Sequence, residues 1–174
     1  MVVDSNRCTG CEVCESVCSM AHYDVFNPEY SRIHRVRIDP ILNTSLACLR
    51  CKDAACVDAC PTEALSQNPE TGTIEIVDEK CNACGSCVRA CSFGVITIHP
   101  DERKAISCDL CVSTQENSPQ CIRYCPKSAI YLKEIDPNKD EDRFTTLSRK
   151  IKDGFPESKE GLLNNMREKY REYT

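Results

Sequence analysis

The chain has 174 residues, of which sixteen are cysteine, with no Trp, four Phe and six Tyr. Its formal net charge is −5, which disfavours nucleic acid or an anionic membrane as its main partner. The composition excludes collagen, coiled coils and low-complexity proteins, and no apolar run reaches the roughly 18 residues of a membrane span.

Without the cysteines, only about a third of the residues are hydrophobic, which is little for a core in a chain of this length. Disulfides or bound metals are the usual substitutes. The first residues contain no charged segment followed by an apolar one, and Cys8 comes too early to leave room for a signal peptide. We therefore expect a cytoplasmic protein whose thiols stay reduced and bind metal.

The cysteines form four groups of four, here called quartets. In chain order they are Cys8, Cys11, Cys14 and Cys18; Cys48, Cys51, Cys56 and Cys60; Cys81, Cys84, Cys87 and Cys91; and Cys108, Cys111, Cys121 and Cys125. The first and third read C-x₂-C-x₂-C-x₃-C, the pattern of bacterial 4Fe–4S ferredoxins, and the other two lengthen only the middle gap. Structural zinc is the alternative, but it favours two C-x₂-C pairs separated by a dozen or more residues.

This spacing suits a cubane cluster. Short gaps let three thiolates reach one cluster, and small residues such as Gly10 let backbone N–H groups approach its sulfides. The fourth cysteine is expected to begin a short helical turn and to bind the other cluster of a pair. Four clusters, each about −2 when oxidised, would bring the net charge to about −13.

Short strands are predicted along the chain, at 1–4, 31–38, 73–78, 95–98 and after Cys125. Residues 48–98 read as one complete two-cluster unit, and residues 1–47 with 99–135 as a second unit that flanks it. The fold class is therefore α+β, with two ferredoxin-like units, one nested inside the other, and a charged helical tail over 136–174. Sequential pairing of the quartets is the alternative. The 29 residues between Cys18 and Cys48, against 20 between Cys60 and Cys81, favour nesting.

Within each unit, we expect the fourth cysteine of one quartet to bind the cluster held by the first three cysteines of the other quartet. This arrangement predicts four ligand sets. Set 1 is Cys8, Cys11, Cys14 and Cys125; set 2 is Cys48, Cys51, Cys56 and Cys91; set 3 is Cys81, Cys84, Cys87 and Cys60; set 4 is Cys108, Cys111, Cys121 and Cys18. His22, His34 and His99 stand alone in the sequence. Because every quartet already has its fourth thiolate, no ligand role is expected for them.

Residues 1–135 resemble the four-cluster electron-transfer subunits of molybdenum and tungsten oxidoreductases, hydrogenases and carbon monoxide dehydrogenase. The resemblance rests on Cys8-Thr9-Gly10-Cys11-Glu12, Cys18-Ser19-Met20-Ala21-His22, Phe26-Asn27-Pro28, Ser31-Arg32-Ile33 and Cys108-Asp109-Leu110-Cys111. The chain looks most like the small subunit of tungsten aldehyde oxidoreductases and class II benzoyl-coenzyme A reductases. Nested pairing is what this resemblance implies as well. Ser19 and Ser92 depart from the Cys-Pro that commonly ends such quartets.

No nucleophile set, phosphate loop or dinucleotide motif is present, so we expect an electron-transfer component without a catalytic site of its own. It would conduct electrons between a large catalytic subunit, with a tungsten- or molybdenum-pterin, and a ferredoxin or a further electron-transfer subunit. The alternatives are a freestanding polyferredoxin, a subunit of a hydrogenase or carbon monoxide dehydrogenase, and a redox sensor. Direct membrane insertion is not expected.

Two other stretches are open to interpretation. Arg35 and Arg37 alternate with apolar residues over 31–38, which indicates a solvated strand face more than a basic docking edge. The tail carries two apolar stripes, which favour packing on a partner subunit at least as much as on the chain's own core. Truncation after residue 136 is expected to weaken complex formation and to leave the iron content intact.

Overall fold

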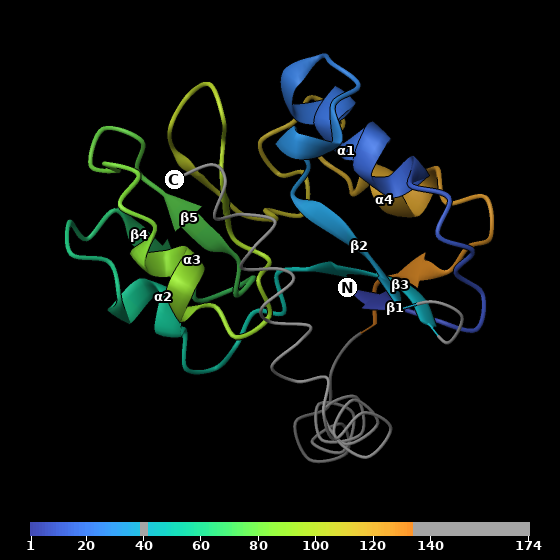
Figure 1. Ribbon diagram of the computed structural model, residues 1–174, viewed down its shortest axis with the longest axis horizontal. Coiled ribbons are helices and arrows are strands. Elements are labelled where there is room, and N and C mark those ends of the chain that lie inside the picture. Colours follow the sequence, from blue (N-terminus) through green and yellow to red (C-terminus); the bar gives the residue numbers. More distant parts are fainter. Residues whose placement is uncertain (39–41, 134–174) are drawn as a thin grey trace. The chain divides into compact units, whose positions relative to one another are not determined.

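The structure, a computed structural model, describes residues 1–38 and 42–133 (Figure 1). Residues 1–132 form one compact unit, and a second unit begins at Lys133. All sixteen cysteines lie in the first unit. The predicted helical tail, residues 136–174, lies outside the described residues.

Each quartet has its third cysteine in a helix. The helices are α1 (Val13–Tyr23), α2 (Ala55–Asp58), α3 (Ser86–Ala90) and α4 (Gln120–Arg123), and a 3-10 helix, η1, spans Pro28–Tyr30. Cys60, Cys91 and Cys125 lie just beyond the ends of α2, α3 and α4, and only Cys18 lies inside a helix. The expectation that the fourth cysteine begins a helical turn is therefore wrong. A three-residue gap spans about one helical turn, so the helix connects the third cysteine to the fourth.

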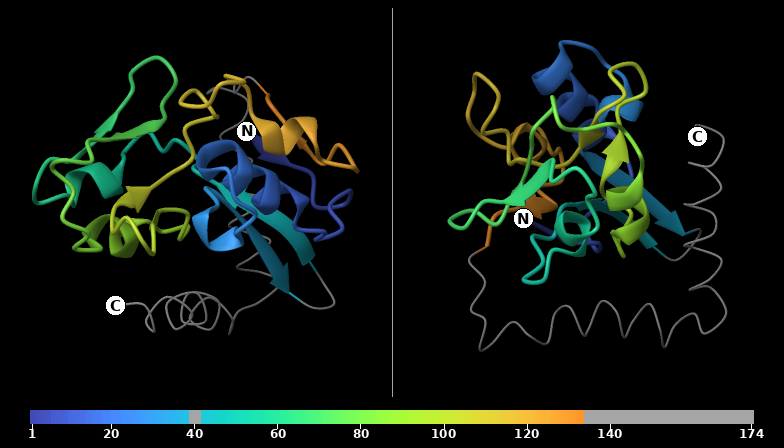
Figure 2. Two further views of the ribbon diagram at one scale, coloured as in Figure 1. Left: turned by 90° about the horizontal axis from the view of Figure 1, so that it is seen from above. Right: turned by 90° about the vertical axis from the view of Figure 1, so that its left-hand side faces the viewer.

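The strands are short and pair as antiparallel ribbons. They are β1 (Val2–Val3), β2 (Ile33–Ile38), β3 (Leu42–Ala47), β4 (Leu65–Gln67), β5 (Ile74–Ile76), β6 (Thr97–Ile98), β7 (Ala105–Ile106) and β8 (Ile130–Tyr131). Within the described residues they form four ribbons, β1–β8, β2–β3, β4–β5 and β6–β7, of which β2–β3 is the long hairpin visible in both views of Figure 2. The predicted α+β class, with short strands and short helices, is confirmed.

The ribbon of β1 and β8 joins two distant parts of the sequence. Val2 lies opposite Tyr131 and Val3 opposite Ile130, and the N–H of Asp4 donates to the carbonyl of Ala129 at 2.8 Å. Helix α1 packs against α4 (Figure 1). The segments that carry the first and fourth quartets are therefore neighbours.

Two separate clusters of buried side chains form the core. The first contains Cys14, Cys18, Ile33, Ala47, Cys121 and Ile130. The second contains Ala64, Leu65, Ile74, Cys87, Ile96 and Ala105. Cysteine thus supplies half of the buried residues of the first cluster, as the small stock of hydrophobic residues led us to expect. Among the described residues, no helix has the length and apolar character needed to cross a bilayer.

Candidate iron–sulfur sites

The same backbone turn opens every quartet. The residue just before the second cysteine has a positive φ in all four, namely Gly10 (69°), Arg50 (55°), Ala83 (56°) and Leu110 (60°). This left-handed conformation costs a non-glycine residue about 1–2 kcal/mol. Three of the four turns therefore adopt a strained backbone to bring two cysteines onto one tight loop, and strain of this kind clusters at ligand sites.

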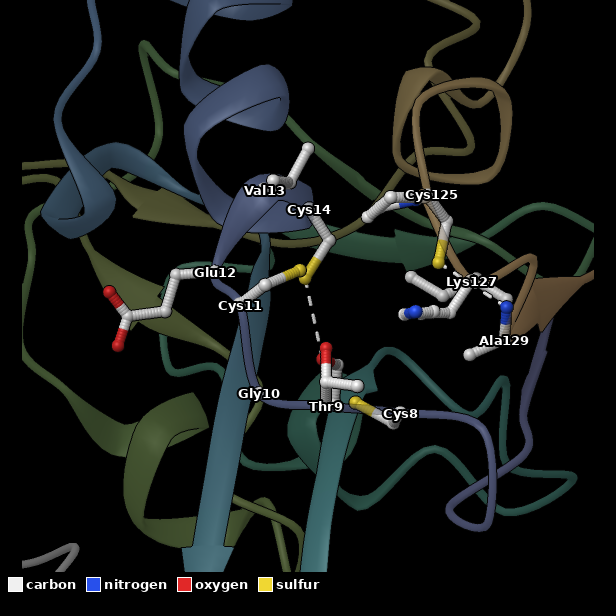
Figure 3. Close-up of a pocket in the computed structure, with 13 residues that line it drawn as sticks. Cys8, Thr9, Gly10, Cys11, Glu12, Val13, Cys14, Cys125, Lys127 and Ala129 are labelled. Carbon is white, nitrogen blue, oxygen red and sulfur yellow. Dashed lines mark hydrogen bonds between the residues drawn. The ribbon is translucent and has the colours of Figure 1, made fainter.

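The four thiols of set 1 line one cavity. Cys8, Cys11, Cys14 and Cys125 surround it together with neighbours from their own loops and Ser45 of β3 (Figure 3). The Ser45 hydroxyl lies 3.3 Å from the Cys14 thiol. Burial, partly offset by that hydroxyl, raises the pKa of the Cys14 thiol to about 11. Thiols from the first and fourth quartets thus face a common space.

The thiols of set 2 interact electrostatically with one another. Burial, together with the nearby Cys91 and Cys48, raises the pKa of the Cys56 thiol to about 11. Burial and the same two neighbours also raise the pKa of Cys51. Neighbouring thiolates repel one another in this way only at short range, and Cys91 acts so on two thiols of the second quartet, Cys51 and Cys56.

Set 3 shows the reciprocal arrangement. Burial raises the pKa of the Cys87 thiol to about 11, and nearby Cys81 and Cys60 act in the same direction. Cys60 also acts on Cys84, although hydrogen bonds to Ser86 lower the pKa of the Cys84 thiol overall. Cys60 therefore lies with the first three cysteines of the third quartet.

Set 4 is the most enclosed. Burial, with nearby Cys18 and Cys111, raises the pKa of the Cys108 thiol to about 12. Burial also raises the pKa of Cys121, and Cys108, Cys18 and Cys111 add to the effect. Cys18, from the middle of α1, thus lies among three cysteines of the fourth quartet.

Backbone N–H groups are directed at one cysteine sulfur in each quartet. The pairs are Arg32 N with Cys18 Sγ at 3.3 Å, Ala64 N with Cys60 Sγ at 3.3 Å, Ala105 N with Cys81 Sγ at 3.4 Å, and Ala129 N with Cys125 Sγ at 3.3 Å. Such hydrogen bonds stabilise a thiolate and raise the potential of the cluster that it ligates.

The charged residues of β2 and α1 are less isolated than the sequence indicated. Arg35 is not a freely solvated side chain, because its guanidinium pairs with Glu12 at 2.7 Å and its backbone N–H donates to Glu15. His99 is buried and stacks with the rings of Tyr23 and Tyr30, at centroid distances of 4.7 and 4.3 Å. The ring contacts of His99 with Tyr23 and Tyr30 attach α1 and η1 to the loop that follows β6.

His22 is a candidate functional side chain to which the sequence analysis assigned no role. Its Nδ1 lies 2.8 Å from the Cys18 carbonyl and its Nε2 lies 3.0 Å from Asp109 Oδ1, so both ring nitrogens face acceptors. Burial opposes the charge, but Asp109 and Cys18 raise the pKa of His22 to about 9. A signal was present in the sequence. His22 follows Cys18 by four residues, one helical turn, and Asp109 lies inside a C-x₂-C gap.

The donor chemistry of these sets fits 4Fe–4S clusters. All sixteen cysteines are free thiols; four of them line one cavity, and thiols of the other three sets influence one another electrostatically. Soft thiolates with backbone N–H donors are the ligands that such clusters take, and bound iron would relieve the repulsion between crowded thiolates. In the described ranges, no three His, Cys, Asp or Glu side chains converge on a site for a single metal ion.

Known proteins share this pattern. Residues 41–135 match the family described as 4Fe-4S dicluster domain, and residues 5–21 match one described as 4Fe-4S binding domain. The polyferredoxin-like subunit of aliphatic sulfonate oxidoreductase from Pyrococcus furiosus is 38% identical over 125 residues, which cover 72% of this chain and 70% of that protein. The electron transport protein HydN of Escherichia coli K12 is 29% identical over 161 residues, covering 80% and 89%.

Among solved structures, the active site complex BamBC of benzoyl coenzyme A reductase with benzoyl-CoA matches with a TM-score of 0.43 and 22% identity. The match covers 85% of this chain and 88% of the matched chain. The dicluster match alone spans more than half of the 174 residues. The chain therefore belongs to the 4Fe-4S dicluster domain family, and its sixteen cysteines provide for four 4Fe–4S clusters.

Proposed function

We propose that this chain is an electron-transfer subunit whose four 4Fe–4S clusters form two linked pairs. Its relatives include an electron transport protein and the polyferredoxin-like subunit of an oxidoreductase. The observation that carries the proposal is the cavity that four free thiols of the first and fourth quartets line together, in a chain with four quartets of the same kind. A 4Fe–4S cluster, when bound, accepts and returns one electron without bond rearrangement in the protein.

The proposed ligand sets are those with crossed fourth cysteines. Set 1 is supported by the cavity that Cys125 shares with Cys8, Cys11 and Cys14. Sets 2 and 3 are supported by the exchange of Cys91 and Cys60 between the second and third quartets. Set 4 is supported by Cys18, which lies among the cysteines of the fourth quartet.

The nested division is proposed on the same grounds. The first core cluster draws on residues 1–47 and 108–130, and the second on residues 48–105. The pairing of β1 with β8 closes the outer unit across the inner one. Ala105 packs in the second cluster and β7 pairs with β6, so the inner unit would extend to about residue 106 instead of 98.

In this proposal the protein part holds and shields the clusters. Buried residues such as Ile33 and Ile96, both 1% exposed, keep water away from the cysteine loops. N–H groups such as those of Arg32 and Ala64 stabilise the reduced, more negative state. Sixteen reduced thiols suit a compartment such as the cytoplasm, and no catalytic site is assigned to this chain.

The proposed partner is a large catalytic oxidoreductase subunit with a tungsten- or molybdenum-pterin. Electrons would pass between that subunit and a ferredoxin or a further electron-transfer subunit. The naming of one relative as a subunit of an oxidoreductase supports a catalytic partner. Purification of the tagged full chain from its native host tests this proposal. Recovery of a stoichiometric pterin-containing subunit is expected, and recovery of the chain alone would favour a freestanding polyferredoxin.

Metal analysis and paired variants test the clusters and their ligands. Anaerobically purified protein should hold about sixteen iron and sixteen sulfide per chain. Cys8→Ser and Cys125→Ser should alter the same EPR signal, because both belong to set 1. Cys108→Ser should alter a different one. If Cys125→Ser and Cys108→Ser alter the same signal and Cys8→Ser another, the crossed assignment is wrong.

A further inference from the structure

Three charged side chains connect the first quartet to the fourth. Asp109 lies between Cys108 and Cys111, and its carboxylate accepts from His22 Nε2 at 3.0 Å and pairs with Arg32 Nη1 at 3.2 Å. The exposed fractions of these side chains are 2% for His22, 18% for Arg32 and 19% for Asp109. We call this group the His22–Asp109–Arg32 clasp. It is far better shielded from water than the pair of Arg35 with Glu12, whose side chains are 28% and 43% exposed.

One end of the clasp fixes the opening loop of the fourth quartet. Asp109 Oδ1 accepts the N–H of Cys111 at 3.0 Å, and Oδ2 accepts the N–H of Ser113 at 3.1 Å and its hydroxyl at 2.5 Å. This carboxylate therefore sets the turn from which two thiols of set 4 project.

The other end of the clasp holds Cys18. His22 donates from Nδ1 to the Cys18 carbonyl at 2.8 Å, and the backbone N–H of Arg32 donates to the Cys18 sulfur at 3.3 Å. The same two residues make both the bonds to Cys18 and the bonds to Asp109. Any movement of Cys18 away from Cys108 and Cys111 must therefore break contacts on both sides.

Because Cys18 and the fourth quartet are far apart in the sequence, long-range contacts must bring them together. Cys18 is separated from Cys108 by most of the chain, so local loop geometry does not place it beside the fourth quartet. Packing of α1 on α4 brings the segments together but does not fix one sulfur atom to within ångströms. A buried network of charged hydrogen bonds is directional enough to do so.

We propose that the His22–Asp109–Arg32 clasp positions Cys18 as the fourth ligand of set 4 and sets the reduction potential of that cluster relative to the other three. The inference rests on the proposed function, because it takes Cys18, Cys108, Cys111 and Cys121 as one ligand set. The guanidinium of Arg32 carries a permanent positive charge, which its ion pair with Asp109 holds at the opening loop of the fourth quartet. That charge and the N–H bond favour the reduced cluster, so the set 4 cluster accepts electrons more readily than it would without them.

Substitutions at Asp109 test whether the clasp assembles the set. Asp109→Asn keeps the shape and one acceptor oxygen for Cys111, but it leaves Arg32 and His22 without a counter-charge. In the full chain, purified without oxygen, we expect iron to fall from about sixteen to about twelve per chain, with three EPR signals unchanged. Asp101→Asn is the matched control, since Asp101 accepts a hydrogen bond from Tyr30 and touches no cysteine. It should keep all four clusters.

A pair of Arg32 variants tests the effect on the potential. Arg32→Met removes the charge and keeps the backbone N–H bond to Cys18, whereas Arg32→Lys keeps the charge. In an EPR-monitored redox titration, Arg32→Met should lower the potential of one cluster only, and Arg32→Lys should restore most of the shift. A general loss of packing would not distinguish the two variants. If Asp109→Asn protein fails to accumulate, this pair decides the question alone.

Two results would overturn the inference. One is Asp109→Asn protein with sixteen iron and four unchanged potentials. The other is a loss of iron or a shift of potential spread over all clusters in the Asp109 and Arg32 variants. A wild-type chain with far fewer than about sixteen iron would instead count against the proposed function, so the two failures are distinguishable.

Discussion

Gly10 is the residue of the first quartet that tolerates a side chain least. It lies between Cys8 and Cys11 with φ 69°, and a Cβ placed on it would come within 2.7 Å of Asn43 Oδ1 on β3. Real Cβ atoms do not approach an oxygen so closely. Gly10→Ala should therefore strain the loop of set 1 and leave the other three loops untouched.

The size of the destabilisation follows from three contributions. The left-handed backbone costs alanine about 1–2 kcal/mol, and moving Asn43 off its preferred rotamer adds about 0.5–1.5 kcal/mol. Alanine also lowers the conformational entropy of the unfolded chain, which stabilises the folded state and offsets about 0.4–1 kcal/mol of this cost. The net destabilisation of the loop is about 2 kcal/mol. If opening the loop relieves this strain, release of iron from set 1 should accelerate about 30-fold, since each 1.36 kcal/mol is a factor of ten.

The assay is the anaerobic release of iron to a chromophoric chelator. One quarter of the iron should leave about 30-fold faster in Gly10→Ala than in the wild type, and the remainder at the wild-type rate. The Asn43→Ala substitution in the Gly10→Ala background removes the collision and should recover part of the difference. Gly85→Ala is the matched control, because its φ is 71° but its Cβ would meet only the flexible end of Arg89 at 3.2 Å.

Gly85→Ala should therefore affect set 3 through the backbone cost alone, which after the offset from the unfolded chain is about 0.8 kcal/mol. Release of iron from set 3 should accelerate about 4-fold. Unchanged release in Gly10→Ala would refute the reasoning. So would a double variant that is no better than Gly10→Ala alone, since the collision with Asn43 would then contribute nothing.

Three other predictions follow from the same geometry. Ala83→Gly should slow iron release from set 3 in the same chelator assay, because Ala83 has φ 56° at the position that Gly10 occupies in the first quartet. Ile33→Ala should lower the free energy of unfolding by about 2–5 kcal/mol, because Ile33 is 1% exposed in the first core cluster. On heating, this variant should lose the visible absorbance of the clusters of sets 1 and 4 first. Complete removal of iron should abolish the hydrogen-exchange protection of α4, because cysteines supply much of the core around it; persisting protection would contradict this.

Several of the short strands were predictable from local pattern, whereas β3 and β7 were not predicted and the helices begin before the fourth cysteines instead of at them. The strand predicted over 73–78 is β5 at Ile74–Ile76, and the strand predicted over 95–98 is β6 at Thr97–Ile98. The strand over 31–38 begins two residues later, at Ile33, after a serine whose hydroxyl bonds the backbone. Alternation of apolar residues carries such information because it depends on immediate neighbours alone.

The chemistry of this protein can be identified from its amino-acid sequence alone. The four quartets keep the same opening and closing gaps, and together they include every cysteine of the chain. The spacing within a quartet indicates which thiols can reach a common cluster. The sequence also indicated that the core would be thin, as the two small clusters of buried residues bear out.

The contacts between distant side chains, in contrast, emerge only from the three-dimensional packing. His22 stands alone in the sequence, yet its Nε2 lies 3.0 Å from Oδ1 of Asp109, which is 87 residues away along the chain. Arg32 joins them only because α1, β2 and the fourth quartet pack together. Ligand spacing is local and can be read from the sequence, whereas the placement of Cys18 by charged neighbours depends on long-range packing that no single segment encodes.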